Sequence, residues 1–308
     1  MKASKYNFVF PYDGDYYVIY NSRTNAFALL NRDEYNGFMG FTQRGEPIAD
    51  SSFCRELEKT LFIINDELDE LNLVWFKLMA TRFNTSRLAL AIAPTSNCNF
   101  RCTYCFERER LAPVTMSDDT QDALIDFLRT YIGSIKQLHI TWYGGEPLMA
   151  LDVVEALTKR FLLLCTEHNI DYRAAMVTNG YLLSPNVVKR LHPLMLSSIQ
   201  VTVDGPPKTH DERRFLLGGK PTFQRILSNL CESRDSMPCL VSLRVNIDKN
   251  NTSEIDDLIS ILKEHNLSHT VRPYLGMVHE MGTSYDRYDR ACCCSVDEFA
   301  QMDLAFRK

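Results

Sequence analysis

The chain of 308 residues is 45% hydrophobic and 24% charged, which excludes disordered and fibrous proteins and leaves room for one large domain beside a small one. Its 34 basic and 39 acidic side chains give a formal net charge of −5, so composition indicates neither a nucleic acid nor a membrane as partner. No apolar run approaches the ~18 residues of a membrane span, and the N-terminus has no export-signal pattern. We therefore expect a cytoplasmic protein whose ten cysteines are reduced and serve metal binding, catalysis or packing.

The first part of the chain predicts a small α+β domain over residues 1–83. Residues 6–30 are rich in aromatic and β-branched residues and contain a turn at Asp13-Gly14, which is typical of an antiparallel hairpin sheet. Apolar residues at helical spacing then predict three helices, over 32–40 (capped by Asn31), 51–64 and 66–78.

From residue 84 onward, strand patterns alternate with helix patterns. Apolar, β-rich runs lie near 87–93, 138–143, 172–177, 198–203, 240–247 and 269–275. Helical stretches lie between them, around 118–132, 150–168, 184–192, 221–234 and 252–265. This alternation predicts an α/β fold with a parallel sheet covered by helices. An open doubly wound sheet and a curled, six-stranded (β/α)6 partial barrel both fit, and periodicity alone does not distinguish them.

Three cysteines follow the first predicted strand in one short loop, AIAPTSNCNFRCTYCFE. Cys98, Cys102 and Cys105 are separated by three and two residues, so their thiolates can converge on one metal centre. A structural zinc site needs a fourth ligand, and the next cysteine, Cys165, lies in an apolar helical stretch. A [4Fe–4S] cluster held by three cysteines fits better, and it leaves one iron open to bind a small molecule. A zinc site completed by a distant residue and buried packing thiols are the alternatives.

The run CNFRCTYCF resembles the cluster loop of radical S-adenosylmethionine (SAM) enzymes, including the aromatic residue before the third cysteine. The resemblance implies that Cys98, Cys102 and Cys105 hold a [4Fe–4S] cluster and that Tyr104 lies near the adenine of SAM. In such enzymes SAM chelates the open iron, and one electron splits it into methionine and a 5′-deoxyadenosyl radical.

The second predicted strand ends in Gly144-Gly145-Glu146-Pro147, which resembles the family's segment that receives the methionine ammonium of SAM. Glycines let backbone carbonyls approach a ligand closely, and carbonyls and a carboxylate are the acceptors that an ammonium group needs. An ordinary turn is the alternative.

Polar residues also follow the third, fourth and fifth predicted strands. Asn179 and Asn246 are candidate SAM contacts, with ordinary strand-end turns as the alternative. The run TVDGPPKTHDERR resembles the anaerobic sulfatase maturase and peptide-modifying branch, where this region helps to contact the ribose and carboxylate of SAM. The candidates that it contributes are Thr202, Asp204 and Arg213, with Arg214 as the alternative arginine.

The resemblance spans residues 87–276 and implies a radical SAM core over 84–276. It implies an enzyme of the peptide-maturase branch that begins its reaction by abstracting hydrogen from a peptide or protein side chain, supplied with electrons by a low-potential donor such as flavodoxin or ferredoxin. Residues 1–83 resemble precursor-peptide recognition domains, although a cap that only packs over the core is the alternative. From another class, the chain would be a non-catalytic iron–sulfur or peptide-binding scaffold.

The branch that this chain resembles normally continues into a cysteine-rich domain, called SPASM or twitch. Here residues 277–308 contain only the triplet Cys292-Cys293-Cys294. We therefore expect a truncated extension and an enzyme that cleaves SAM but modifies substrate poorly. One cysteine of the triplet is a candidate first ligand of an auxiliary cluster, and inert thiols are the alternative.

Overall fold

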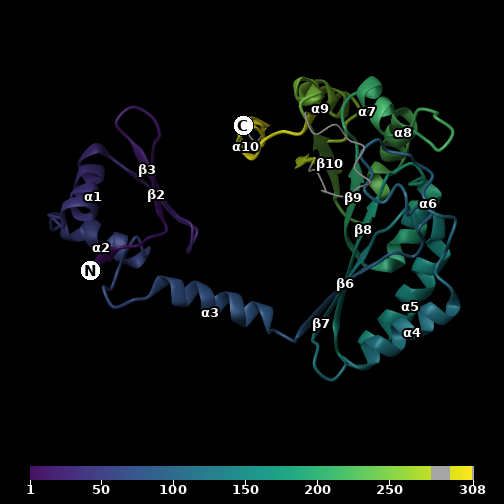
Figure 1. The fold of residues 1–308 in the computed structure, drawn as a ribbon, viewed down its shortest axis with the longest axis horizontal. Coiled ribbons are helices and arrows are strands. Elements are labelled where there is room, and N and C mark those ends of the chain that lie inside the picture. Colours follow the sequence, from purple (N-terminus) through teal and green to yellow (C-terminus); the bar gives the residue numbers. More distant parts are fainter. Residues whose placement is uncertain (279–291, 307–308) are drawn as a thin grey trace. The chain divides into compact units, whose positions relative to one another are not determined.

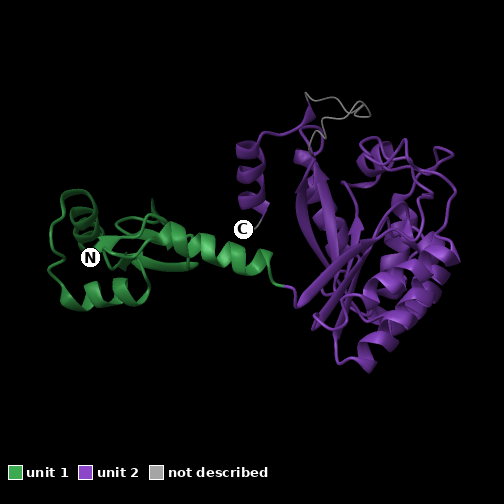
Figure 2. Cartoon of the chain, turned by 60° about the horizontal axis from the view of Figure 1, so that its bottom comes forward, with its two compact units in different colours: residues 1–84 green, residues 85–308 purple. Residues whose placement is uncertain are grey.

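The computed structural model describes residues 1–278 and 292–306, in two compact units that cover residues 1–84 and 85–308. Figure 2 colours them separately, and we call them the N-terminal unit and the core unit. Each has its own cluster of buried apolar side chains. Within the described residues, no helix is long and apolar enough to cross a membrane.

The N-terminal unit contains a three-stranded antiparallel sheet in the order β2-β3-β4, followed by helices. Its elements are β1 (Lys2–Ala3), β2 (Asn7–Pro11), β3 (Tyr17–Asn21), β4 (Ala26–Leu30), α1 (Arg32–Arg44), α2 (Ser51–Lys59), β5 (Ile63–Ile64) and α3 (Glu70–Arg82). Asn31 begins α1 with a capping box, in which its side chain accepts from the Glu34 amide and the Glu34 carboxylate accepts from the Asn31 amide.

The helix expected over 51–64 is shorter in the structure and ends at Lys59. Leu61 adopts a left-handed backbone (φ 61°), which stops the helix, and the buried pair Ile63–Ile64 then forms β5 against β1. The expected helix over 66–78 begins later, at Glu70, because Asp69 caps it by accepting from the Asn72 amide. Helical spacing of apolar residues therefore continued past the true helix end, into residues that a short strand buries instead.

A buried carboxylate joins the two ends of the N-terminal unit. Glu70 is 4% exposed and accepts from the Ser4 hydroxyl at 2.5 Å, the Lys5 amide at 2.7 Å and the Arg23 Nε at 3.0 Å. Burial by itself raises the pKa of Glu70, but the three donors outweigh it and hold that pKa below its usual value of 4.5. Since the Arg23 side chain is also buried, each charge compensates the other.

We predict that Glu70→Ala destabilises the N-terminal unit by about 3–5 kcal/mol, because it leaves the Arg23 charge buried without its partner. The measurement is hydrogen exchange resolved by mass spectrometry, which should show faster exchange in residues 1–84 and little change in 85–308. The matched control is Glu56→Ala, which breaks an exposed ion pair with Lys59 and should leave hydrogen exchange almost unchanged.

The same carboxylate gives a pH dependence of known sign. Because the folded-state pKa of Glu70 lies below its unfolded value, its stabilising effect is complete above that unfolded value and is lost as pH falls through the folded-state pKa. The stability difference between wild type and Glu70→Ala should therefore shrink as pH falls below 4.5. A difference that stays constant down to acid pH would contradict this assignment.

The core unit is a six-stranded parallel sheet in the order β11-β10-β9-β8-β7-β6. Its strands are β6 (Arg87–Ile92), β7 (Gln137–Trp142), β8 (Asp171–Thr178), β9 (Leu196–Thr202), β10 (Val241–Ile247) and β11 (Val271–Met277). Its helices are α4 (Asp118–Arg129), α5 (Leu151–Glu167), α6 (Pro185–Leu191), α7 (Pro207–Arg213), α8 (Phe223–Ser233), α9 (Ile255–Glu264) and α10 (Val296–Phe306), with 3-10 turns η1 (Pro147–Ala150), η2 (His192–Leu194), η3 (Arg234–Ser236) and η4 (Thr252–Glu254).

The strand order decides between the two folds that periodicity left open. A doubly wound sheet reverses its strand order once, whereas this order never reverses. Right-handed crossovers then place every connecting helix on the same face, as Figure 1 shows for α4, α5 and α6. The sheet curls inside this helical layer, so the expectation of a (β/α)6 partial barrel is confirmed.

Side chains along each strand alternate between the helical layer and the inside of the barrel. On β8, Tyr172, Ala174 and Met176 are buried, and the Tyr172 ring lies 6.5 Å from that of Phe161 on α5. The intervening positions face inward, and one of them, Val177, lines a cavity. Inward positions near the carboxyl ends of the strands are therefore free to form a site.

The described part of the C-terminal segment packs on the core unit. Cys294 is buried, and the apolar side of α10, through Phe299, Met302 and Phe306, contacts the main core. The Lys249 amide donates to the Cys292 carbonyl at 2.9 Å. Of the expected extension over 277–308, residues 279–291 and 307–308 lie outside the described residues. The auxiliary-cluster role of the triplet stays a prediction.

Candidate functional site

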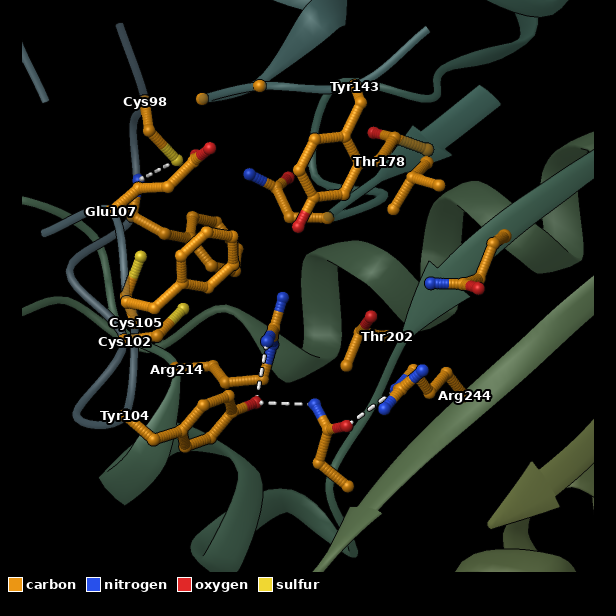
Figure 3. A pocket seen from close by; sticks show the side chains of 18 of the residues that line it. Cys98, Cys102, Tyr104, Cys105, Glu107, Tyr143, Thr178, Thr202, Arg214 and Arg244 are labelled. Carbon is orange, nitrogen blue, oxygen red and sulfur yellow. Dashed lines mark hydrogen bonds between the residues drawn. The ribbon is translucent and has the colours of Figure 1, made fainter. Parts of the chain in front are cut away.

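A cavity of about 570 Å³ opens at the carboxyl ends of the core strands, within the usual size range of small-molecule sites (Figure 3). The segment between β6 and α4, residues 94–116, forms one wall and carries the three cysteines, so we call it the cysteine loop. Strands β7 to β11, the turns that follow them and Arg214 after α7 provide the remaining walls. Loops at this end of a parallel sheet are where ligand-binding groups gather.

The cysteine loop is held from two sides. On one side it is closed on itself, because the Ser96 amide donates to the Val114 carbonyl at 3.0 Å. On the other side it pairs with the segment after α7: the Arg101 amide donates to the Phe215 carbonyl at 2.8 Å, and the Thr103 amide donates to the Arg213 carbonyl at 2.9 Å. These backbone bonds fix the loop without using the thiols.

All three thiols of this loop line the cavity, with Cys102 buried and Cys98 and Cys105 half-buried. Burial raises the pKa of Cys98 to about 12 and also raises the pKa of Cys102 and Cys105. Thiolates here therefore need a cation, such as bound iron, to offset their loss of hydration.

Three thiols in one cavity wall match the ligand set of a [4Fe–4S] cluster held by three cysteines. Within the described ranges, no group of three or more His, Cys, Asp or Glu side chains surrounds a position for one metal ion. In a [4Fe–4S] cluster each thiolate binds a different iron, so the thiols need not meet at one point. The donor set of three thiols fits this group.

The expected glycine segment packs directly against the cysteine loop. Gly144 has a left-handed backbone (φ 102°), and a Cβ at Gly145 would lie only 2.2 Å from the Asn97 carbonyl oxygen. The Gly145 amide also donates to the Thr95 carbonyl at 3.2 Å. Both glycines line the cavity, but the contact that requires Gly145 is with protein backbone, not with open space for a ligand.

Glu146 is turned away from the cavity. Its carboxylate is 1% exposed and accepts from the Thr178 hydroxyl at 2.6 Å, the Asn179 amide at 2.7 Å and the Leu148 amide at 3.1 Å. Burial raises the pKa of Glu146, while these three donors lower it in part. The carboxylate that we expected to receive an ammonium group instead ties the end of β7 to the end of β8, and Pro147 behind it begins η1.

Tyr104 is the centre of a buried polar network. Its hydroxyl donates to the Asp204 carboxylate and accepts from Arg214 Nη1 at 2.7 Å and from Asn246 Nδ2 at 3.0 Å. Burial raises the pKa of Tyr104 well above its ordinary value, so the phenol stays protonated. The ring is thereby held in one orientation beside Cys102 and Cys105 (Figure 3).

The structure separates the two candidate arginines. Arg213 is paired with Asp204 (Nε at 3.3 Å) and Asp248 (Nη1 at 2.5 Å), and it does not line the cavity. Arg214 does line it, and the Nε of Arg214 has no hydrogen-bond partner among the described residues. The arginine available to a ligand is therefore Arg214, whereas Arg213 and Asp204 are parts of the supporting framework.

Most of the residues expected from the sequence meet in this cavity. Those that line it are Cys98, Cys102, Tyr104, Cys105, Gly144, Gly145, Asn179, Thr202 and Asn246. Those that lie behind its walls are Glu146, Pro147, Asp204 and Arg213.

Several lining residues were not expected from the sequence, namely Glu107, Thr141, Tyr143, Gln200 and Arg244. Strand alternation offers a signal for two of them, because Gln200 and Arg244 lie two positions before Thr202 and Asn246 and so share their faces. Asn251 was not expected either, and its side chain donates to the carbonyls of Asp204 at 2.7 Å and Asn246 at 2.9 Å.

We predict that Gly145→Ala lowers the free energy of unfolding by about 1–3 kcal/mol even without metal or SAM, because the new methyl group collides with the Asn97 carbonyl. The measurement is the melting temperature, which should fall. The control is Gly133→Ala, where no atom lies within 4 Å of the added Cβ. An unchanged melting temperature with weakened SAM binding would show instead that Gly145 is needed only for the ligand.

Comparison with known proteins identifies the family of this chain. The sequence model of the radical SAM superfamily matches residues 92–262. The chain is 29% identical over 175 residues to an Fe-coproporphyrin III synthase of Methanosarcina barkeri, covering 56% of this chain and 40% of that protein. It is 28% identical over 186 residues to a GTP 3′,8-cyclase of Sulfurimonas denitrificans, covering 58% and 53%. The chain thus spans about half the length of the curated relatives it matches.

Solved structures with bound S-adenosylmethionine share the fold. For anSMEcpe with AdoMet and the Cp18Cys peptide the TM-score is 0.56, with 18% identity over 70% of this chain and 57% of that chain. For Streptococcus suis SuiB bound to S-adenosylmethionine the TM-score is 0.52, with 18% identity over 100% of this chain and 69% of that chain. Together with the family match, which covers more than half of the residues, this establishes that the chain belongs to the radical SAM superfamily.

Proposed function

We propose that the chain is a radical SAM enzyme that modifies a side chain of a peptide or protein, with Cys98, Cys102 and Cys105 as the ligands of its [4Fe–4S] cluster. Membership of the superfamily implies this cluster and SAM as cofactors. When bound, the cluster supplies the electron that splits SAM into methionine and a 5′-deoxyadenosyl radical. The protein's part is to hold a substrate C–H bond beside the 5′ carbon and to exclude water and oxygen.

The cavity residues divide into groups that touch SAM and groups that position them. In this proposal the Tyr104 ring lies beside the adenine, and the backbone carbonyls at Gly144 and Gly145 accept from the methionine ammonium. Arg214, a buried cation at the cavity wall, receives the methionine carboxylate. The remaining polar groups of the wall that we assign to SAM are Asn179, Thr202 and Asn246.

The proposal of a peptide substrate is supported by the likeness of the whole chain, N-terminal unit included, to a peptide-bound structure. SuiB bound to its precursor peptide SuiA gives a TM-score of 0.53 over 99% of this chain, at 17% identity. The curated relatives named for GTP and coproporphyrin chemistry match little more than half of the chain.

The N-terminal unit has the parts that peptide capture needs. Its sheet ends in two edge strands, β2 and β4, since among the described residues each pairs only with β3. An edge strand presents unpaired amide and carbonyl groups to which an extended peptide can add. We propose that this sheet binds a leader segment of the substrate while the core unit acts on another part of it.

We predict that anaerobically reconstituted protein carries about four irons and four sulfides per chain. Replacing Cys98, Cys102 and Cys105 together by Ala should remove the iron and the brown colour, because no thiolates remain to bind it. The matched control replaces Cys54, Cys231 and Cys239 by Ala, which deletes as many thiols away from the cavity. Full iron content in the first variant would show that these three cysteines are not the ligands of the cluster.

A second assay separates an enzyme from a scaffold. Under strong reductant, the reconstituted protein should form 5′-deoxyadenosine from SAM, whereas a scaffold would bind the cluster or a peptide without turnover. Failure to form 5′-deoxyadenosine in a protein with full iron and bound SAM would favour the scaffold. If 5′-deoxyadenosine forms, mass spectrometry of candidate precursor peptides would identify the modified residue.

We predict that the full chain binds a leader peptide encoded beside its gene at about micromolar concentration, and that a chain of residues 85–308 does not. Fluorescence anisotropy with a labelled leader measures both. The shorter chain should still bind SAM, which shows that its core unit is folded. Equal leader affinity of the two chains would show that the N-terminal unit does not bind the leader, which would favour a cap that only packs over the core.

A further inference from the structure

The cavity contains a second cation whose charge no described residue neutralises. Arg244 lies on β10 two residues before Asn246, so both side chains face the cavity. Arg213, by contrast, is paired with two buried carboxylates. Within residues 1–278 and 292–306, Arg244 forms no ion pair with any Asp or Glu, and its only side-chain partner is the Asn246 Oδ1, which accepts from Nε at 2.7 Å.

The neighbouring strand, β11, has a glycine where the Arg244 guanidinium packs against it. A Cβ at Gly276 on β11 would lie 2.6 Å from the Arg244 Nε, 2.7 Å from Cζ and 2.8 Å from Nη2. No left-handed backbone explains this glycine, so its role is to leave room for the guanidinium. Arg244 is therefore oriented by Asn246 at one edge and by Gly276 along its plane, with the charge turned to the cavity (Figure 3).

SAM does not account for this charge. SAM carries one carboxylate, and the proposed function assigns it to Arg214, which contacts Tyr104 beside the cysteines. Figure 3 shows Arg244 on the opposite side of the pocket from Cys98, Cys102 and Cys105. The adenosine part of SAM bears no anion that could reach across to it. A second cation in one cavity therefore implies a second anion, which the substrate must bring.

The other charge of the cavity limits what this anion can be. Glu107 lines the same cavity. A triphosphate would bring several negative charges into a cavity whose wall also carries Glu107, with one free guanidinium to balance them. A single carboxylate instead matches the two-pronged geometry of one guanidinium. The electrostatics favour a substrate with one anionic group at this position.

We propose that Arg244 binds a carboxylate of the substrate, so that the modified peptide carries an acidic side chain or a terminal carboxylate at or next to the modified residue. This inference rests on the proposed function, because it takes SAM and a peptide as the two occupants of the cavity. Arg244 is then a specificity-determining residue rather than a catalytic one.

The test measures how fast phenylglyoxal modifies Arg244, read by mass spectrometry, in the cluster-loaded full chain. The probes are SAM alone, and SAM with acetyl-Ala-Glu-Ala-amide, acetyl-Ala-Gln-Ala-amide or pyrophosphate. The glutamate peptide should slow modification about fivefold more than the glutamine peptide, because occupancy protects the guanidinium in proportion to bound ligand. The exposed Arg225 on α8 is the internal control and should react at one rate throughout.

Each other outcome counts against the proposal. Equal protection by the two peptides would show that Arg244 does not bind the glutamate carboxylate. Stronger protection by pyrophosphate would indicate a phosphorylated substrate instead of a carboxylate. Full protection by SAM alone would assign Arg244 to the cofactor, and no reaction in the unliganded protein would show that the guanidinium does not face the cavity.

A second variant tests orientation without removing the charge. Gly276→Ala displaces the guanidinium and should abolish the difference between the two peptides, whereas Gly133→Ala, with open space around its Cβ, should keep it. If Gly276→Ala keeps the full difference in protection between the two peptides, Gly276 does not orient the Arg244 guanidinium. SAM binding by the wild-type chain, measured separately by equilibrium dialysis, distinguishes the two failures. A wild-type chain that does not bind SAM refutes the proposed function, while a wild-type chain that binds SAM but does not discriminate between the two peptides refutes only the role of Arg244.

Discussion

The site of this protein depends on one buried carboxylate, that of Asp204. The side chain is fully buried at the end of β9 and accepts from the Tyr104 hydroxyl, from Arg213 and from the Asn246 amide. A carboxylate can be buried this deeply only when charges and donors compensate it, and here these come from the cysteine loop, from α7 and from β10. Separate parts of the chain are thereby joined at one point, directly behind the cavity wall.

A second constraint is the narrow space into which the cysteine loop fits. Gly145 packs against the carbonyl of Asn97 on one side, and the segment containing Arg213 and Phe215 pairs with the loop on the other. The loop that carries the thiols is thus part of the same rigid assembly as the residues assigned to SAM. Holding both from one framework is how a fold can place a cofactor and a metal group at a set separation, since rigid elements position a site better than free loops.

The two units divide the work that the proposed function requires. The core unit contains the whole cavity, while the N-terminal unit has its own core and its own buried charge pair. In the proposed function, recognition takes place at exposed sheet edges and chemistry at the carboxyl ends of a parallel sheet. If a leader and a reacting residue bind separately, as proposed, the cavity does not have to recognise a long sequence. A single charged contact at Arg244 would then be enough to select among the side chains that reach it.

The sequence by itself determined the family, the order of elements and the cysteine loop. Strand and helix periods are local properties, so the residue pattern alone locates the six strands and their helices. The spacing of Cys98, Cys102 and Cys105, with Tyr104 inside it, also lies within one loop. The carboxyl ends of parallel strands share one edge, which is why Asn179, Thr202 and Asn246 could be expected to meet.

Only the tertiary structure decided what depends on side-chain direction and on contacts between distant segments. Arg213 and Arg214 are neighbours in sequence, yet one is buried between two carboxylates and the other lines the cavity, because successive residues at the end of α7 point in different directions. Glu146 faces the protein because the donors of Thr178 and Asn179 lie behind it. The choice of barrel over open sheet, and the seat of Arg244 on Gly276, likewise follow from strand order and from the pairing of β10 with β11, which no local pattern encodes.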